Sequence, residues 1–170
     1  MLHLHPSVTF DRGAFLSFLL IGSMGCGPSA PSATGTANPV ETRKMFVVVP
    51  AESDAFPLAA RATTERLRRA RVKGFQEPEV SKVSLEVVQL SIECVEPTPT
   101  CYEAVGKELS ASQLLFAEID PGPKRDQVKV TVTLFDVEGR KRKRAVAKIF
   151  ATEDDVPFGV ADVVSEATKP

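Results

Sequence analysis

The three cysteines of the chain are the residues whose type and spacing point most directly to chemistry. Cys94 and Cys101 are separated by Val-Glu-Pro-Thr-Pro-Thr, a spacing that allows a disulfide to pin a proline-containing turn between two elements. By the chain-entropy estimate, closing such a loop is worth only about 2–3 kcal/mol. Two thiols without further Cys or His ligands make a poor zinc site. The spacing also differs from Cys-x-x-Cys, although a redox-active pair remains an alternative.

Cys26 stands at the end of a short apolar segment, residues 14–25. A permanent membrane helix needs roughly 20 apolar residues, whereas a shorter apolar core that ends in small residues is typical of a cleavable export signal. We therefore predict a signal peptide over residues 1–25 and lipidation of Cys26, as in a bacterial lipoprotein.

This segment departs from the usual lipoprotein signal in two ways. Gly25 fits the position before a lipidated cysteine, but Ser23 stands where Leu is usual and Met24 is also atypical. Arg12 is the only firm positive charge ahead of the apolar run. An ordinary secretory signal cut near these residues and an uncleaved amphipathic anchor therefore remain alternatives.

Residues 26–43 predict a flexible tether behind the anchor. The part from Gly27 to Pro39 has no charge and almost no large apolar side chain, so burial cannot offset the entropy cost of ordering it. A lipidated Cys26 usually carries a diacylglyceryl group and an N-acyl chain, and stable anchoring requires more than one chain. We expect the tether to hold the following domain away from a membrane surface.

The charge balance excludes a global electrostatic attraction to nucleic acid. The chain has 21 basic and 22 acidic residues and a net charge of −1, so no nucleic-acid partner is predicted. Residues 44–170 form a segment of ordinary size for one domain with a single core.

The positions of the histidines argue against most enzyme classes. His3 and His5 both lie in the predicted signal, which leaves no histidine for nucleophile activation or zinc binding in the exported chain. Gly106-Lys107 is followed by Glu108, so no phosphate-binding loop is formed. We predict no catalytic, cofactor-binding or metal-binding residue.

Carboxylate catalysis stays formally open because several acidic residues are available. Most of them fall in expected turns or at the ends of elements, where capping and turn formation are the ordinary roles. A working acid and base would need a paired geometry. The candidates are Glu118, Asp120, Asp126, Asp136, Glu153, Asp154 and Asp155.

The pattern of apolar residues predicts a mixed α/β (α+β) domain of two or three layers, with four to five strands in a mixed sheet, a C-terminal β-hairpin and three to four helices. We expect strands at 45–49, 113–118, 128–135 and 144–151, and helices at 57–71, 82–93, 101–109 and 156–167. Residues 82–93 also fit a strand, and we choose the helix. Thr100 is expected to cap the third helix, and Asp154 or Asp155 the fourth.

Two surfaces are predicted to carry positive charge. The first helix should bury Ala60, Thr63, Leu67 and Ala70 and expose Arg61, Arg66, Arg68, Arg69 and Arg71. The predicted hairpin tip contains Arg140, Lys141, Arg142, Lys143 and Arg144. Export argues against nuclear import or nucleic-acid binding by this basic run. It is either a solvated tip that protects the sheet edge or a docking site for an anionic envelope partner, such as a lipid phosphate or an acidic protein face.

The order of elements resembles a small domain found in bacterial envelope proteins. It is similar to the amino-terminal domain of TolB and to outer-membrane lipoproteins that activate peptidoglycan synthases or build the curli secretion channel. The residues that carry the resemblance are Glu108-Leu-Ser-Ala-Ser-Gln-Leu-Leu-Phe-Ala-Glu118 and a hairpin that turns at Asp136-Val-Glu-Gly139. The Pro-Thr-Pro segment between the two later cysteines also resembles lipoproteins of unassigned function from predatory and gliding bacteria.

The resemblance implies a non-enzymatic domain that binds another protein of the envelope. It implies a lipoprotein that faces the periplasm, at the outer rather than the inner membrane, or one at the cell surface. No functional residue transfers from these families, because they share no catalytic motif with this chain. A small-ligand-binding domain and a weak carboxylate-based envelope hydrolase are the alternative functions.

Overall fold

The computed structural model of the chain describes residues 44–94 and 96–170. The predicted signal peptide, Cys26 and the tether lie outside these residues. The strands are β1 (Phe46–Val48), β2 (Glu79–Val80), β3 (Gln113–Pro121), β4 (Val128–Asp136) and β5 (Lys141–Phe150). The helices are α1 (Pro57–Leu67), α2 (Leu85–Ser91), α3 (Pro99–Glu108) and α4 (Val156–Thr168), with a 3₁₀ turn at Glu153–Asp155 before α4.

The strands form one mixed sheet with the order β2-β1-β3-β4-β5. β1 runs parallel to both β2 and β3, whereas β3, β4 and β5 form an antiparallel meander. The chain leaves β1 through α1 and returns at β2, then crosses through α2 and α3 to β3. The predicted fold class, including the C-terminal hairpin, is confirmed.

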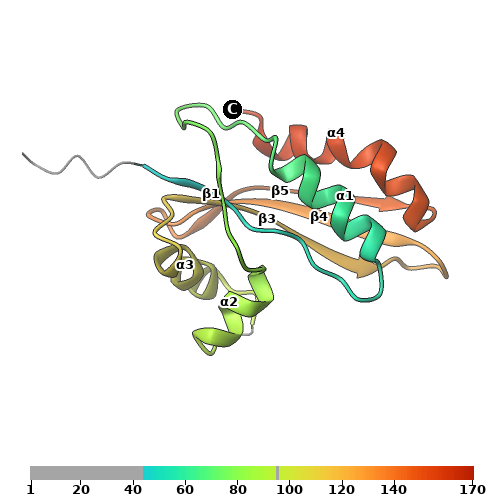
Figure 1. Cartoon of the computed structure of the whole chain (residues 1–170), viewed down its shortest axis with the longest axis horizontal. Helices are drawn as coiled ribbons and strands as arrows, with labels where there is room; N and C mark the ends of the chain where they lie inside the picture. The colour runs from blue at the N-terminus through green and yellow to red at the C-terminus, as the bar shows by residue number, and fades with distance from the viewer. Residues whose placement is uncertain (1–43, 95) are drawn as a thin grey trace, which may run out of the picture. The chain divides into compact units, whose positions relative to one another are not determined.

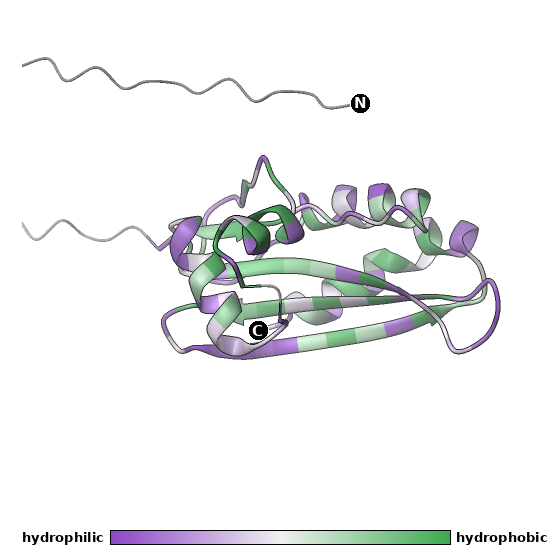
Figure 2. Ribbon diagram, turned by 90° about the horizontal axis from the view of Figure 1, so that it is seen from below, coloured by the Kyte–Doolittle hydropathy of each residue, from purple (hydrophilic) through white to green (hydrophobic). Residues whose placement is uncertain are grey.

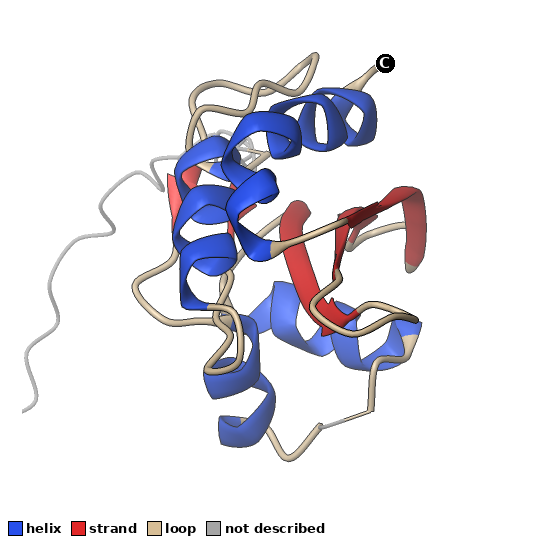
Figure 3. Ribbon diagram, turned by 90° about the vertical axis from the view of Figure 1, so that its right-hand side faces the viewer, coloured by secondary structure: helices blue, strands red, loops and turns tan. Residues whose placement is uncertain are grey.

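Helices cover both faces of the sheet, so the domain has three layers. α1 and α4 pack on one face and α2 and α3 lie on the other (Figures 1 and 3). The interior strand β1 is apolar on both sides for this reason: Phe46 and Val48 join the core under α1 and α4, and Val47 joins the core against α2 and α3.

The hairpin strands follow the predicted alternation. Val128, Val130, Val132 and Leu134 are buried beneath α4 and α1. Phe135 points to the opposite face and packs with Tyr102 and Phe116 in the second core. Figure 2 shows the hydrophobic residues gathered along the strands and the inner sides of the helices.

Several predicted boundaries were wrong, each for a local reason. α1 ends at Leu67 rather than Arg71, and the chain tightens into a turn in which Ala70 N–H donates to Leu67 O (2.9 Å). β3 runs past Glu118 to Pro121 because it stays paired with β4 along its whole length. The helix chosen for residues 82–93 is confirmed as the shorter α2.

The predicted cap of α3 was wrong, whereas Asp155, one of the two predicted caps of α4, occupies the N-cap position of that helix. Thr98 caps α3 in place of Thr100, because Pro99 occupies the first helical position that proline favours. Thr152 is the N-cap of the 3₁₀ turn before α4, and its N–H and hydroxyl both donate to Asp155 Oδ2 (3.0 and 2.9 Å). The Asp155 side chain therefore serves as the acidic partner in a capping box and makes no capping hydrogen bond to α4.

Gly106 lets α3 approach the end of β4. A Cβ at this position would lie 2.3 Å from Val137 Cγ2, closer than any real contact allows. Gly106 is therefore required for the packing of α3 against the end of β4, and the helix continues past it to Glu108.

We expect Gly106→Ala to lower the free energy of unfolding by about 1–2 kcal/mol. Overpacking costs about 1–3 kcal/mol, and the better helix propensity of Ala returns up to about 1 kcal/mol. Denaturant unfolding measures the change. A Val137→Ala background removes the two clashing methyl groups and leaves only Val137 Cβ, at 3.1 Å, so the same substitution should cost much less there. A loss of equal size in both backgrounds would contradict the packing explanation.

Candidate functional site

A disulfide joins the end of α2 to the start of α3. Cys94 and Cys101 are bonded with their Cα atoms 5.5 Å apart, the pair that the sequence predicted. Cys101 is buried, and the Gln89 amide donates to its sulfur (3.4 Å). The bond therefore fixes how α2 and α3 lie together on the sheet.

Tyr102, Glu118 and Arg142 meet beside α3, where β5 and the C-terminal half of β3 approach it. The Tyr102 hydroxyl donates to Glu118 Oε1 (3.2 Å), and the Arg142 guanidinium lies 5.6 Å from the centre of the Tyr102 ring. Arg142 also donates to Pro97 O (3.5 Å). Burial, followed by the negative charge of Glu118 and its hydrogen bond, raises the pKa of Tyr102 to about 12.

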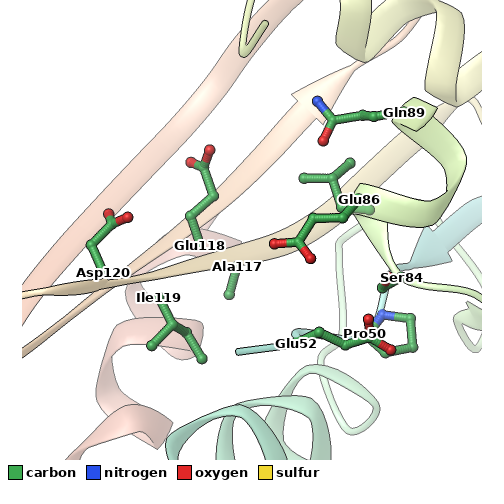
Figure 4. A pocket seen from close by; sticks show the side chains of 10 residues that line it. Pro50, Glu52, Ser84, Glu86, Gln89, Ala117, Glu118, Ile119 and Asp120 are labelled. Atoms are coloured by element: carbon green, nitrogen blue, oxygen red, sulfur yellow. The ribbon is translucent and has the colours of Figure 1, made fainter. Parts of the chain in front are cut away.

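A small acidic cavity lies at the carboxyl ends of β1 and β3. It has a volume of about 170 Å³. Glu118 and Asp120 project from the same side of β3, Glu86 extends toward that strand from the start of α2, and Glu52 lies after β1 (Figure 4). None of the described residues that line it is a cation. The carboxyl edge of parallel strands, where the crossovers diverge to opposite faces, is the usual ligand position in α/β sheets.

The other candidate carboxylates serve as caps and turn residues. Glu153 Oε1 accepts hydrogen bonds from Leu58 N–H (2.6 Å) and Ala59 N–H (3.0 Å) and so caps α1. Asp136 Oδ1 accepts from Gly139 N–H (3.1 Å) in the hairpin turn. Asp126 occupies a turn with a positive φ of 65°. Of the predicted set, only Glu118 and Asp120 line the acidic cavity.

The described residues contain neither a metal-binding cluster nor a membrane-spanning helix. In residues 44–94 and 96–170, no group of three or more His, Cys, Asp or Glu side chains is placed to hold a metal ion. The helices of these same residues are too short or too polar to cross a membrane.

The basic run does not form the hairpin tip that the sequence suggested. The hairpin turn is short, because Asp136 of β4 already pairs with Lys141 of β5. Residues Lys141 to Arg144 therefore belong to β5 and not to the turn. Only Arg140 lies in the turn, with a positive φ of 50°. Successive residues of a strand point to opposite faces, so the run is divided between the two sides of the sheet.

Most of these cations have partners within the domain. Arg140 pairs with Glu103 (3.0 Å), Lys143 with Asp136 (3.8 Å) and Arg144 with Glu166 (3.5 Å). The hydrogen bond from Lys107, aided by the charge of Arg140, holds the pKa of Glu103 below its ordinary value. Lys141 has no ion pair with any described residue. The basic run therefore does not form a single continuous basic patch.

The hydrogen-bond alternation of the meander decides which backbone groups of β5 face outward. Val137 N–H donates to Ser112 O (3.1 Å) and Gly122 N–H donates to Gln127 O (2.7 Å), one at each end of the β3–β4 ladder. In an antiparallel pair, bonded and non-bonded residue pairs alternate. The odd-numbered residues of β4 therefore bond to β3, and its even-numbered residues bond to β5.

It follows that Val146 and Lys148 bond to β4, whereas Ala145, Ala147 and Ile149 direct their N–H and C=O groups away from the sheet. The side chains of these three outward residues are exposed, and Ile149 is 50% exposed. β5 is the last strand of the sheet, and it spans 10 residues. The outermost strand in Figure 2 is hydrophilic at its start and largely hydrophobic beyond.

Sequence reasoning missed this edge and the Tyr102–Glu118 pair. A signal for the pair was present, since a buried tyrosine needs a hydrogen-bond partner and Glu118 follows a continuous apolar run. The outward backbone of β5 had no such signal, because the pairing register decides it.

The single tyrosine of the chain makes its environment directly measurable. We expect ultraviolet titration to give a midpoint near pH 12 in the folded protein, against an ordinary value of 10.0. A raised phenol pKa stabilises the fold at pH values below the unfolded pKa, and this contribution is lost as the pH rises from about 10 to about 12. Glu118→Gln should lower the midpoint. An ordinary midpoint in folded protein would contradict the burial and pairing of this hydroxyl.

Comparison with known proteins gives no family assignment. No known protein family matches the chain, and no curated protein matches it. Among solved structures, the chain is similar to the LpoB C-terminal domain from Salmonella enterica, with 14% identity and a TM-score of 0.41 over 67% of this chain and 87% of that chain. It is also similar to the LpoB C-terminal domain from Escherichia coli, with 14% identity and a TM-score of 0.38 over 64% of this chain and 82% of that chain.

A PelC dodecamer from Paraburkholderia phytofirmans is similar at 13% identity and a TM-score of 0.40, over 75% of this chain and 91% of that chain. These scores are too low to carry an argument about function. The conclusions that follow rest on the residues of this chain.

Proposed function

We propose that this protein is a non-enzymatic, membrane-anchored lipoprotein of the bacterial envelope whose αβ domain is a protein-interaction module. The sequence around Cys26 and the uncharged tether support the anchor. The open edge of β5 supports the interaction and is the observation that carries the proposal. We also propose that the lipoprotein faces the periplasm, at the outer rather than the inner membrane, or that it lies at the cell surface.

An edge strand with free N–H and C=O groups is a template for another strand. Extended segments of partner proteins add to such edges, with main-chain hydrogen bonds giving affinity and side chains giving specificity. The outward groups of Ala145, Ala147 and Ile149 offer three successive sites of this kind. The small side chains of Ala145 and Ala147 leave room for larger side chains of an added strand.

The charge of β5 selects an acidic partner. The strand carries Lys141, Arg142, Lys143, Arg144 and Lys148 and no acidic residue. Pairing of two β5 strands would bring like charges together, and cationic edge residues are a common way to prevent that association. An extended segment rich in Asp or Glu has the opposite charge, so it gains attraction where a second copy meets repulsion.

Small-ligand binding at the acidic cavity is the second candidate function. Four carboxylates favour a cationic ligand, but the volume of about 170 Å³ is below the roughly 300–1,000 Å³ of typical ligand pockets. For carboxylate hydrolysis, the roles of Glu153, Asp136 and Asp155 in capping and turn formation account for those residues without catalysis. The edge of β5 is therefore the stronger basis.

The edge proposal is tested with a fluorescent peptide of alternating Glu and Val, and with a matched peptide in which Lys replaces Glu. We expect the acidic peptide to bind the full chain and the basic peptide not to bind. Ala147→Pro should weaken binding about tenfold, because it removes an outward N–H while leaving the bonds to β4 in place. Fluorescence anisotropy measures both affinities.

Ala147→Val is the matched control, since it keeps the N–H and suits a strand, so its affinity should equal that of the unmodified chain. Lys148→Glu should also weaken the acidic peptide and needs no backbone change. Equal binding of the acidic and basic peptides, or unchanged affinity in both Ala147→Pro and Lys148→Glu, would rule out strand addition at this edge.

The anchor is tested by metabolic labelling with a fatty acid in a bacterial host. The unmodified chain should incorporate the label and sediment with membranes, and Cys26→Ala should do neither, because its side chain cannot form the thioether that carries the lipid. Absence of label in the unmodified chain, or a Cys26→Ala protein that stays on the membrane, would contradict the proposal.

A further inference from the structure

A cavity lined by cations lies where the end of α4 meets the start of β5. Its volume is about 320 Å³. Lys73 contributes from the loop after α1, Lys143 and Arg144 from β5, and Lys169 from the residue after α4. Segments far apart in the sequence therefore place four cations around one space, and no Asp or Glu side chain is part of its lining.

Nearby carboxylates neutralise only part of this charge. Glu166 pairs with Arg144 (3.5 Å) and also with Lys169, and Asp136 lies 3.8 Å from Lys143. Lys73 has no ion pair with a described residue. Four cations thus face two side-chain carboxylates, so a positive charge remains around the cavity.

A second basic cavity continues from the first. It has a volume of about 300 Å³, and Thr168 lines both cavities. Arg66, Arg69 and Arg71 of α1 and the turn after it contribute to its wall. Of these, Arg71 pairs with Glu77 (3.1 Å). The arginines that the sequence placed on the exposed face of α1 thus extend the positive region around the end of α4.

The inner wall of the first cavity includes an unusual amide. Gln113 is 4% exposed, and its Oε1 has no hydrogen-bond donor among the described residues. A buried acceptor without a donor is costly to leave unmet. Rotation of the terminal amide presents either its oxygen or its nitrogen to the cavity, so a ligand hydroxyl there gains a partner that the protein does not supply.

We propose that this cavity binds a phosphate group esterified to a hydroxyl-bearing head group, such as glycerol phosphate or a sugar phosphate. The phosphate contacts Lys73, Lys143 and Lys169, and the head-group hydroxyl bonds to Gln113. Gln113 pairs with Phe46 at the start of β1, so the cavity lies at the end of the domain where the chain enters from residue 44. The inference does not depend on an acidic partner at β5.

Calorimetric titration of the full chain with glycerol phosphate and with inorganic phosphate tests the site. Glycerol phosphate should bind more tightly. Lys73→Glu combined with Lys169→Glu should weaken both ligands about tenfold or more. Gln113→Leu should reduce the affinity for glycerol phosphate to that of inorganic phosphate and leave inorganic phosphate unchanged, since only the hydroxyl contact is removed.

The charge-matched control is Lys82→Glu combined with Lys124→Glu, two exposed lysines elsewhere in the domain. It should leave both affinities unchanged. If the control weakens phosphate binding by the same factor, the effect comes from net charge alone and the site is overturned. The site is also overturned if neither phosphate binds to the unmodified chain. Ala147→Pro should bind glycerol phosphate with unchanged affinity. Loss of peptide binding at β5 and loss of phosphate binding at the cavity can therefore be told apart.

Vesicles identify the source of the phosphate. Binding to phosphatidylglycerol vesicles beyond that to phosphatidylcholine vesicles, lost in Lys73→Glu with Lys169→Glu but kept in the control, assigns a lipid head group. Binding of glycerol phosphate without such a vesicle difference assigns a soluble phosphate ester. If the soluble ester does not bind, and if both the Lys73→Glu with Lys169→Glu variant and the control lose the preference for phosphatidylglycerol vesicles, the chain is attracted to membranes by its general charge. That result would overturn the cavity site.

Discussion

The interior strand β1 is buried on both faces, and the remaining architecture depends on this constraint. Its residues Phe46–Val48 contribute side chains to two separate cores, which requires helices above and below the sheet. The crossovers supply them, α1 on one side and α2 with α3 on the other. However, β1 has three residues, whereas β3, β4 and β5 have nine, nine and ten.

The difference in strand length leaves part of the meander uncovered. α4 packs over β4 and β5 on the first face, whereas on the second face α3 reaches β5 only near its start, where Arg142 lies against Tyr102 (Figure 1). The outward side chains Ala145, Ala147 and Ile149 are exposed for this reason. The same outer strand has no neighbour within the described sheet, so the exposed face and the free backbone edge occur together.

The two ends of the sheet also differ in charge. Carboxylates surround the cavity at the carboxyl ends of β1 and β3, and cations surround the cavities near the end of α4. An opposite distribution of charge at two ends orients a charged partner as it approaches and disfavours the wrong orientation. The cancellation of 21 basic and 22 acidic residues in the whole chain conceals this separation.

The sequence predicted the features that depend on local patterns. The run at 45–49, the alternation from Val128 to Leu134 and the buried face of α1 all have the expected partners. The cap at Thr98 was missed because two neighbouring threonines compete and Pro99 decides between them. The cationic cavity was out of reach, since Lys73, Lys143 and Lys169 meet only through the tertiary fold.

The open edge of β5 is the central claim, and residue-resolved amide hydrogen exchange of the free full chain tests it most directly. The amides of Val146 and Lys148 should exchange slowly because they bond to β4, and those of Ala145, Ala147 and Ile149 should exchange quickly because they face away from the sheet. Slow exchange at all five positions would mean that the edge is already covered and would contradict the account.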